Sequence, residues 1–165
     1  MSEILGALFK YLVGLLGVGA VVLMSYNVFG SNKTQNAVSD LSLLQTNTQN
    51  LYNGQSSFST LTNTVAINGK LAPSGMTVPS STTALQNPWG GTVTIAPNTN
   101  TARFDITETA VPAESCAKIA VAMGAVVGLS VNGTAQTLPL DAGAAVTACN
   151  VSAAAGNTLV MTFSK

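Results

Sequence analysis

Residues 8–30 read LFKYLVGLLGVGAVVLMSYNVFG, and this stretch decides how the whole chain is organised. Lys10 and Lys33 are separated by 22 residues without a charged side chain. A helix needs roughly 20 predominantly apolar residues to cross the hydrocarbon core of a bilayer, so this run is long enough to do so. A helix that is apolar all round must be buried. We expect it to be buried in an assembly.

The polar sequence that follows continues the helix and carries one apolar stripe. Its spacings of three, four and seven residues place the apolar side chains on one helical face. These residues are Ala37, Val38, Leu41, Leu44, Leu51 and Tyr52. Asn53-Gly54 is a suitable stop, because glycine readily takes the left-handed conformation past a helix end. The sequence therefore predicts one long helix over residues 1–53, with an apolar half (1–32) and an amphipathic half (33–53).

The apolar half contains glycines and two charged residues that need an explanation. Gly14, Gly17 and Gly19 fit a glycine-rich membrane anchor, or packing positions that allow close approach of helices and soften the helix locally. We favour the second interpretation. Glu3 and Lys10 would be costly to bury without partners. At a membrane interface both can stay near water, whereas in a bundle Glu3 can pair with a neighbouring chain's α-amino group and Lys10 with Glu3.

The composition excludes several classes of function. Only six basic and six acidic residues occur, and the formal net charge is zero. A neutral surface rich in Thr, Ser, Asn and Gln lacks the basic patch expected of a nucleic-acid-binding protein, so we expect no direct nucleic-acid binding. It also resists self-association poorly, because net charge keeps molecules apart. That property suits a subunit that polymerises.

The sequence shows no catalytic, cofactor-binding or metal-binding site. The chain has no histidine, which removes the commonest general base and metal ligand. Phosphate-binding loops, dinucleotide fingerprints and zinc signatures are also missing from it. Asp105 and Glu108 are close in sequence, but on a strand they would point to opposite faces and form a poor acid–base pair. We therefore expect no enzyme and no cofactor.

Cys116 and Cys149 are the only two cysteines. They are too few for a structural zinc site and too far apart for a redox Cys-x-x-Cys pair. Beside an apolar export segment, a disulfide in an oxidising compartment is the better interpretation. Two free buried thiols are the alternative.

Residues 54–165 have the pattern of a small α+β domain. Alternation and turn signals predict hairpins around Asn68-Gly69 and Asn132-Gly133, and a turn at NPWGG (87–91) with Trp89 filling a small core. Strands are expected over 92–95, over 103–107 and, as a central strand, over the C-terminal NTLVMTFSK. A second helix is expected over 112–124, with Cys116, Ile119, Ala120 and Met123 on one face. We predict the long N-terminal helix packed on an antiparallel sheet, with this short helix beside it.

These residues together resemble the type IVb pilins, particularly those of thin conjugative and enterobacterial pili. The resemblance rests on the apolar helix that runs into an amphipathic one, NPWGG, the PAESCAKIA helix, and a second cysteine followed by the strand NTLVMTFSK. It spans almost the whole chain. No single motif is decisive, but their order is fairly specific.

The resemblance implies a major pilin with the type IV pilin fold. Such subunits are cut by a prepilin peptidase, wait in the inner membrane with the assembly machinery, and are extruded into an extracellular helical homopolymer. The pilus would support mating-pair contact in conjugation, adhesion to a recipient or host cell surface, or aggregation. The Cys116–Cys149 disulfide would bound the variable C-terminal region. The helices of the filament core would pack through Leu8, Leu12, Gly14, Leu15, Gly17, Gly19 and Val22.

Two positions depart from the family pattern. Most such pilins carry glutamate at mature position 5, where this chain has Leu5, so either Glu3 substitutes for it or the filament lacks that contact. The helix-breaking proline near position 22 is replaced by Val22, which leaves the glycines to soften the helix. We expect Met1 to lie at the mature N-terminus; the alternative is that MSEILG is a degenerate leader ending at Gly6.

Two other functions remain as alternatives. A pseudopilin of a type II-like secretion system would share the N-terminal helix, but major pseudopilins usually carry a calcium site instead of a disulfide, and the sequence has no acidic loop. A membrane-anchored, monomeric binding protein would form no polymer.

Overall fold

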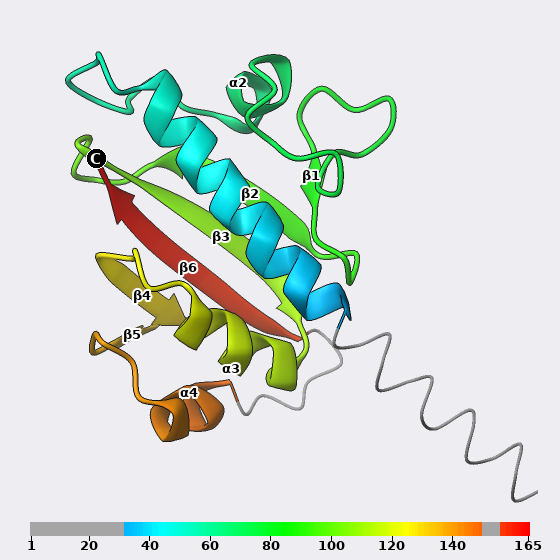
Figure 1. Ribbon diagram of the computed structural model, residues 1–165, viewed down its shortest axis with the longest axis vertical. Helices are drawn as coiled ribbons and strands as arrows, with labels where there is room; N and C mark the ends of the chain where they lie inside the picture. Colours follow the sequence, from blue (N-terminus) through cyan, green and yellow to red (C-terminus); the bar gives the residue numbers. More distant parts are fainter. Residues whose placement is uncertain (1–31, 150–155) are drawn as a thin grey trace, which may run out of the picture. The chain divides into compact units, whose positions relative to one another are not determined.

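A six-stranded antiparallel sheet forms the centre of the domain, which is seen in a computed structural model (Figure 1) that describes residues 32–149 and 156–165. The order across the sheet is β1-β2-β3-β6-β4-β5. The strands are β1 (Leu85–Gln86), β2 (Thr92–Pro97), β3 (Arg103–Val111), β4 (Gly128–Val131), β5 (Thr134–Gln136) and β6 (Asn157–Ser164). The C-terminal strand β6 lies between β3 and β4, so its predicted central place is confirmed.

The sheet has one buried face because its strands alternate. In β6 the residues from Asn157 to Ser164 alternate strictly between buried and half-buried. In β3, Phe104, Ile106 and Glu108 are buried, whereas Asp105 lies on the other face. The prediction that Asp105 and Glu108 point in opposite directions is therefore confirmed.

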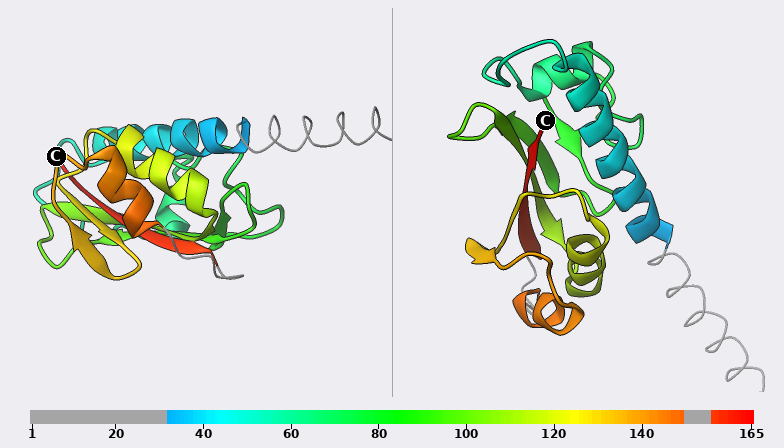
Figure 2. Two further views of the ribbon diagram at one scale, coloured as in Figure 1. Left: turned by 90° about the horizontal axis from the view of Figure 1, so that it is seen from below. Right: turned by 60° about the vertical axis from the view of Figure 1, so that its left-hand side comes forward.

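Helix 32–51 and α3 (Ala113–Ala122) cover the buried face of the sheet (Figure 2). The predicted stripe holds at Ala37, Leu41 and Leu44, which are fully buried. The prediction that Leu51 belongs to the buried stripe is wrong, because this residue is 48% exposed. Thr48 takes its place: its hydroxyl donates to the Leu44 carbonyl at 2.6 Å, so a polar side chain can be buried there without losing a hydrogen bond.

The helix ends differently from the prediction. Its helical residues stop at 51, and Tyr52 still donates its N–H to the Thr48 carbonyl at 3.1 Å. A turn follows, in which the Gln55 N–H donates to the Tyr52 carbonyl at 3.0 Å. Gly54 is not in the left-handed region, so a hydrogen-bonded turn, not a left-handed glycine, terminates this helix.

The expected hairpin at Asn68-Gly69 is wrong, because these residues end α2 (Asn63–Asn68). The Thr62 hydroxyl accepts a hydrogen bond from the Val65 N–H and caps the helix. Ala66 is buried, and the Gly69 N–H donates to the carbonyls of Val65 and Ile67. The capping residue and the buried alanine thus outweigh the alternation of Val65 and Ile67.

Other expected elements are confirmed. The predicted second helix is α3, and its predicted face is buried. The turn at Asn132-Gly133 joins β4 to β5. NPWGG is a turn between β1 and β2, in which the Asn87 side-chain oxygen accepts hydrogen bonds from the N–H groups of Trp89 and Gly91. A Cβ at Gly91 would overlap the Thr109 carbonyl, so only glycine fits this approach to β3.

Trp89 does not fill the centre of the core, because it is only partly buried and packs at the periphery. The centre is instead a row of four aromatic rings. Their centroids lie 5.1 Å apart for Tyr52 and Phe58, 4.8 Å for Phe58 and Phe104, and 5.4 Å for Phe104 and Phe163. Such a row connects the end of helix 32–51 to the two central strands.

The predicted apolar half lies outside the described residues except for Asn32. In the part that the structure does describe, no helix combines the length and apolarity that a membrane crossing requires.

A matched pair of leucines tests the packing of helix 32–51. We expect Leu41→Ala to lower the free energy of unfolding by about 2–5 kcal/mol, because it leaves a cavity at a fully buried site. Leu43→Ala, on the same helix but 49% exposed, should change it by less than about 1 kcal/mol. Denaturant unfolding of the full-length chain in detergent, followed by the fluorescence of the single tryptophan Trp89, measures both; equal effects would contradict the described packing.

Candidate functional site

The part of the domain enclosed by the two cysteines forms the candidate functional site. This disulfide-bounded region, residues 116–149, contains most of α3, the β4–β5 hairpin and α4 (Ala142–Ala148). The cysteines are bonded to each other, and their Cα atoms lie 5.8 Å apart. The sequence-based preference for a disulfide over two free thiols is thus confirmed.

The disulfide attaches a short helix that has little packing of its own. Cys116 lies on the buried face of α3, and Cys149 follows the last residue of α4. Within α4 only Ala145 is buried. A helix of seven residues is unstable by itself, so the covalent link to α3 is a main determinant of its position.

Helix α4 was missed at the level of sequence. A signal for it exists: the Asp141 carboxylate accepts hydrogen bonds from the N–H groups of Gly143 (2.8 Å) and Ala144 (3.2 Å), which is an N-cap arrangement. An aspartate followed by an alanine-rich segment is typical of a helix start. The segment is too short to show an apolar period, which is why the pattern of apolar residues did not reveal it.

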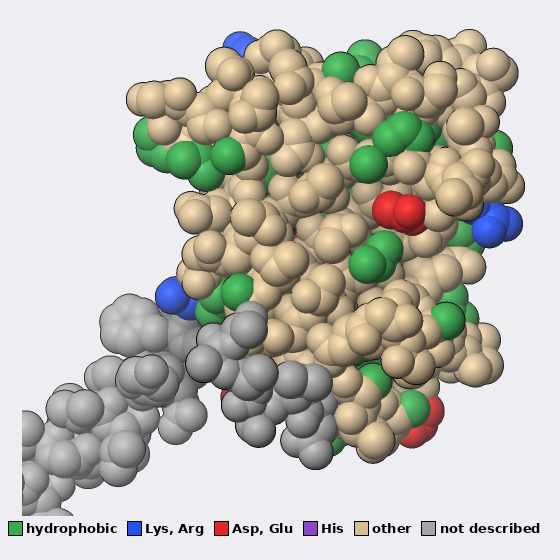
Figure 3. Space-filling model, turned by 180° about the vertical axis from the view of Figure 1, so that it is seen from behind, with side chains coloured by type: hydrophobic (Ala, Val, Ile, Leu, Met, Phe, Trp, Pro, Cys, Tyr) green, Lys and Arg blue, Asp and Glu red, His purple; other side chains and the backbone are tan. Residues whose placement is uncertain are grey.

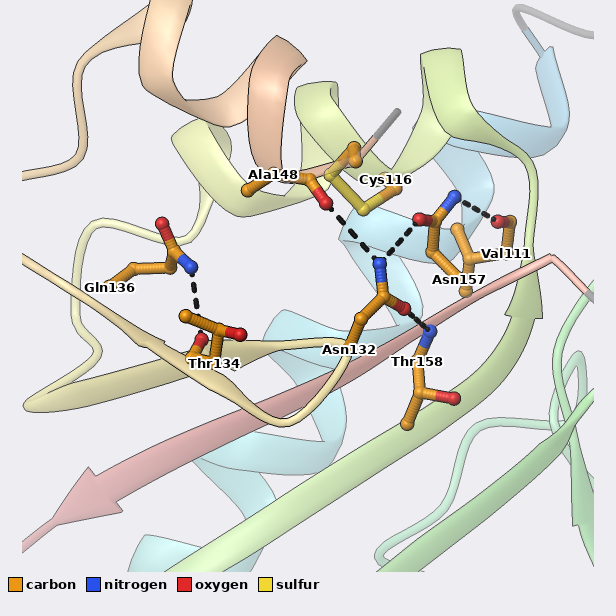
Figure 4. The surroundings of a disulfide bond; sticks show 9 residues. Val111, Cys116, Asn132, Thr134, Gln136, Ala148, Asn157 and Thr158 are labelled. Atoms are coloured by element: carbon orange, nitrogen blue, oxygen red, sulfur yellow. Dashed lines mark hydrogen bonds between the residues drawn. A yellow bond between two sulfur atoms is a disulfide. The ribbon is translucent and has the colours of Figure 1, made fainter. Parts of the chain in front are cut away.

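Asn132 holds the hairpin, α4 and β6 together (Figure 4). Its side-chain N–H₂ donates to the Ala148 carbonyl at 3.2 Å and to the Asn157 side-chain oxygen at 2.8 Å. Its side-chain oxygen accepts from the Thr158 N–H at 2.9 Å. Asn157, itself fully buried, donates to the Val111 carbonyl at 3.2 Å. The sequence predicted the turn at Asn132 but not these contacts, which need the tertiary arrangement.

The geometry of this turn requires the residues that it contains. Asn132 has φ of 52° and Gly133 has φ of 81°, which is the left-handed pair of a tight hairpin turn. Asparagine tolerates this conformation better than most residues, and glycine adopts it freely.

A hollow of about 460 Å³ lies between the hairpin and α4. Its lining consists of uncharged residues: Val131, Asn132, Thr134, Gln136, Ala144, Thr147 and Ala148. Methyl, hydroxyl and amide groups can contact a neutral surface, but they supply neither a strong nucleophile nor a general base. The hollow is therefore suited to contact and not to covalent chemistry.

Charged groups near this region are few and exposed. Lys118 and Glu114 form an ion pair at 2.7 Å on the outside of α3, and such a surface pair contributes little stability. Val121, Val127 and Val146 are 47%, 43% and 63% exposed. The face of the sheet that helix 32–51 and α3 leave uncovered likewise shows few charged side chains (Figure 3). Among the described residues, no cluster of three or more His, Cys, Asp or Glu could hold a metal ion.

The other predicted site residues cannot be placed by the structure. Glu3 and Lys10, and the predicted filament-core positions, lie outside the described residues. Those positions are Leu8, Leu12, Gly14, Leu15, Gly17, Gly19 and Val22. Their roles stay predictions.

The disulfide has a direct chemical test. We expect the unreduced, denatured chain to show no reactive thiol, and the double variant Cys116→Ser/Cys149→Ser to lose about 2–4 kcal/mol of unfolding free energy, because the crosslink restricts the unfolded chain. Reduction of the wild type should give the same loss. Two reactive thiols per unreduced chain would contradict the crosslink.

Two solved structures with a similar architecture are pilins. Residues 31–164 match the family model PilS, described as PilS N terminal. The NMR structure of the type IVb pilin PilS from Salmonella typhi is similar with a TM-score of 0.56 and 26% identity, covering 80% of this chain and 96% of that one. The crystal structure of TcpA, a type IV pilin from Vibrio cholerae El Tor biotype, has a TM-score of 0.56 at 15% identity, covering 81% and 99%.

A search of curated proteins gave no significant match. The family model nevertheless covers most of the chain, and the TcpA likeness supports the fold. Pilins are structural subunits that self-assemble into pili on the cell surface, and they are not enzymes. The chain belongs to the PilS family of type IVb pilins.

Proposed function

We propose that this chain is the major pilin of a type IVb pilus and polymerises through its apolar N-terminal helix. The observation that carries the proposal is the uncharged run between Lys10 and Lys33, which leads directly into helix 32–51 of a PilS-family domain. The chain then has two functional parts, the helix over 1–53 and the globular domain over 54–165.

Cohesion of the filament core follows from close packing. Lipid is as apolar as a neighbouring helix, so transfer from membrane to filament gains little from the hydrophobic effect. Small residues such as Gly14, Gly17 and Gly19 let helices approach closely and gain dispersion contacts. Leu8, Leu12, Leu15 and Val22 fill the space between them. Contacts of this head-to-tail kind that do not close on themselves produce an open helical polymer.

The charged residues of the apolar half fit the same arrangement. In a filament core, Glu3 pairs with the α-amino group of a neighbouring subunit, and Lys10 pairs with Glu3 of the same or another subunit. Each pairing removes the cost of burying an isolated charge. Glu3 thereby replaces the glutamate that most such pilins carry at position 5.

The described domain supports a role at the surface of the filament. Helix 32–51 is fixed to the sheet by its buried stripe and by side-chain hydrogen bonds, such as Asn47 to the Leu71 carbonyl (2.9 Å) and Gln49 to the Ser164 carbonyl (2.6 Å). The domain is therefore packed on the helix that follows the apolar segment in the sequence. The disulfide-bounded region presents a neutral contact surface that a crosslink keeps in shape.

The route to the surface follows that of the family. A prepilin peptidase and an inner-membrane assembly machinery process the subunit while the apolar helix holds it in the inner membrane. The assembled pilus is extracellular, where the disulfide is stable. There it supports mating-pair contact in conjugation, adhesion to recipient or host cells, or aggregation of the bacteria.

Electron microscopy of material sheared from expressing cells tests the proposal. We expect thin filaments from the wild type and none from Gly14→Glu, because a carboxylate in the apolar core lacks a partner. Gly54→Glu is the matched control, since a Cβ at Gly54 meets no atom within 4 Å in the subunit, and it should leave filaments intact. A wild type that stays in the membrane fraction without filaments would favour the membrane-anchored monomer.

The same three strains separate the possible roles of the pilus. Transfer frequency with a recipient strain measures mating contact, binding to host cells measures adhesion, and settling of a liquid culture measures aggregation. The role of the pilus is the activity that is lost in Gly14→Glu and kept in Gly54→Glu.

A further inference from the structure

Glu108 is a fully buried acidic residue of the sheet. It lies on the buried face of β3, and its side chain has no exposed surface. The paired residues on either side are Val93 of β2 and Leu159 of β6. Among the described residues, no group donates a hydrogen bond to either carboxylate oxygen. Because its neighbours are aliphatic and no hydrogen-bond donor in the described part of the chain reaches it, a negative charge at this position is energetically unfavourable.

Asp105, three residues earlier on the same strand, shows how this domain otherwise treats a carboxylate. It accepts hydrogen bonds from the Thr162 hydroxyl at 2.6 Å and from the Asn98 amide at 2.8 and 3.0 Å. Ionised carboxylates in proteins are normally satisfied in this way. The contrast indicates that Glu108 is accommodated in its protonated form.

The charged group that faces Glu108 makes ionisation still less favourable. Asp40, on helix 32–51, is half-buried beside Gly75, and its negative charge opposes a second one nearby. Strands β2 and β6 carry no charged residue, and the Glu114–Lys118 pair of α3 lies on the exterior. Burial first, and Asp40 second, raise the pKa of Glu108 from its ordinary value of 4.5 to about 8.

We propose that Glu108 is a proton-dependent latch between helix 32–51 and the sheet: the protonated side chain permits their packing, and loss of its proton opens the helix from the sheet. The latch does not depend on what the pilus contacts, since it is a property of the folded subunit.

When Glu108 ionises, we expect helix 32–51 to move and the strands to stay paired, because backbone hydrogen bonds join the strands. From Phe104 to Glu108, β3 pairs residue by residue with both β2 and β6, and the ladder to β6 shifts register between Glu108 and Val111. Helix 32–51 is held by side-chain packing and a few side-chain hydrogen bonds, among them those of Asn47 and Gln49. An ionised Glu108 reaches water with the smallest loss of contacts when the helix moves away from it.

The direction of the pH effect follows from the two pKa values. In the unfolded chain Glu108 loses its proton near pH 4.5, whereas in the folded chain it keeps the proton until about pH 8. Between these values folding takes up a proton, so the folded state loses stability as pH rises. The folding equilibrium constant falls up to about tenfold per pH unit in this window and levels off above it.

The chain offers an unusually clean test, because it has no histidine. Few groups other than the α-amino terminus ordinarily titrate between pH 5 and 8. We expect denaturant unfolding of the full-length chain in detergent to show stability that declines from pH 5 to 8. Glu108→Gln, which keeps the shape but cannot ionise, should remove most of the decline. Glu114→Gln, an exposed acid in an ion pair, should leave it unchanged.

Hydrogen exchange locates the opening. After correction for the intrinsic rate, we expect amides of residues 37–48 to lose protection between pH 6 and 8.5 in the wild type, with a smaller loss in β6. In Glu108→Gln both segments should keep their protection. Equal loss in the two segments would show global unfolding and overturn the latch.

A measurement on the wild type avoids any dependence on the variants. The side-chain carboxyl carbon of Glu108, followed by NMR in the full-length chain, should titrate near pH 8. Titration near pH 4.5 would overturn the proposal. Calcium chloride gives a second such outcome. If it stabilises the wild type at pH 8 but does not stabilise Glu108→Gln, the proposal is overturned, because Glu108 would then serve as a cation ligand and not as a proton-dependent latch.

Discussion

The packing of helix 32–51 onto the buried face of the sheet is the contact on which the rest of this domain depends. Ala37, Leu41 and Leu44 close one side of the core, and the aromatic row continues it from Tyr52 to the last strand. In the sequence, the apolar segment directly precedes this helix. The buried face of this helix thus closes the core of the domain. In the chain, the helix links the domain to the segment that we propose to polymerise.

Sequence alone predicted those elements whose signal is local and repeated over several residues. The alternation in NTLVMTFSK and the stripe of residues 37–44 are of this kind. The two Asn-Gly pairs show the limit of local signals. Asn132-Gly133 lies between two strands and is a hairpin, whereas Asn68-Gly69 ends a helix that Thr62 caps and the core holds through Ala66. The same dipeptide serves both structures, so its surroundings decide.

The disulfide of the candidate site could be predicted from the sequence, whereas its side-chain hydrogen bonds could not. With only two cysteines the partner of Cys116 had one possibility, Cys149. The contacts of Asn132 join residues 16 and 25 positions apart, and no sequence period encodes such a distance. Alternation correctly placed Glu108 opposite Asp105, but it could not show that the inward side chain lacks a donor. Whether a donor reaches Glu108 depends on how β2, β3, β6 and helix 32–51 pack around it.

The position of Glu108 also bears on why such a chain retains an acid in its core. Only six acidic residues occur in the whole sequence, and a neutral surface favours association of copies. A buried pair of aliphatic neighbours would accept leucine or methionine without a desolvation cost. Retaining glutamate there makes the helix–sheet contact responsive to protons while the surface stays neutral. In a polymer every subunit carries this group, so one change in pH acts on all subunits in the same direction. The surfaces that hold the filament together need not change.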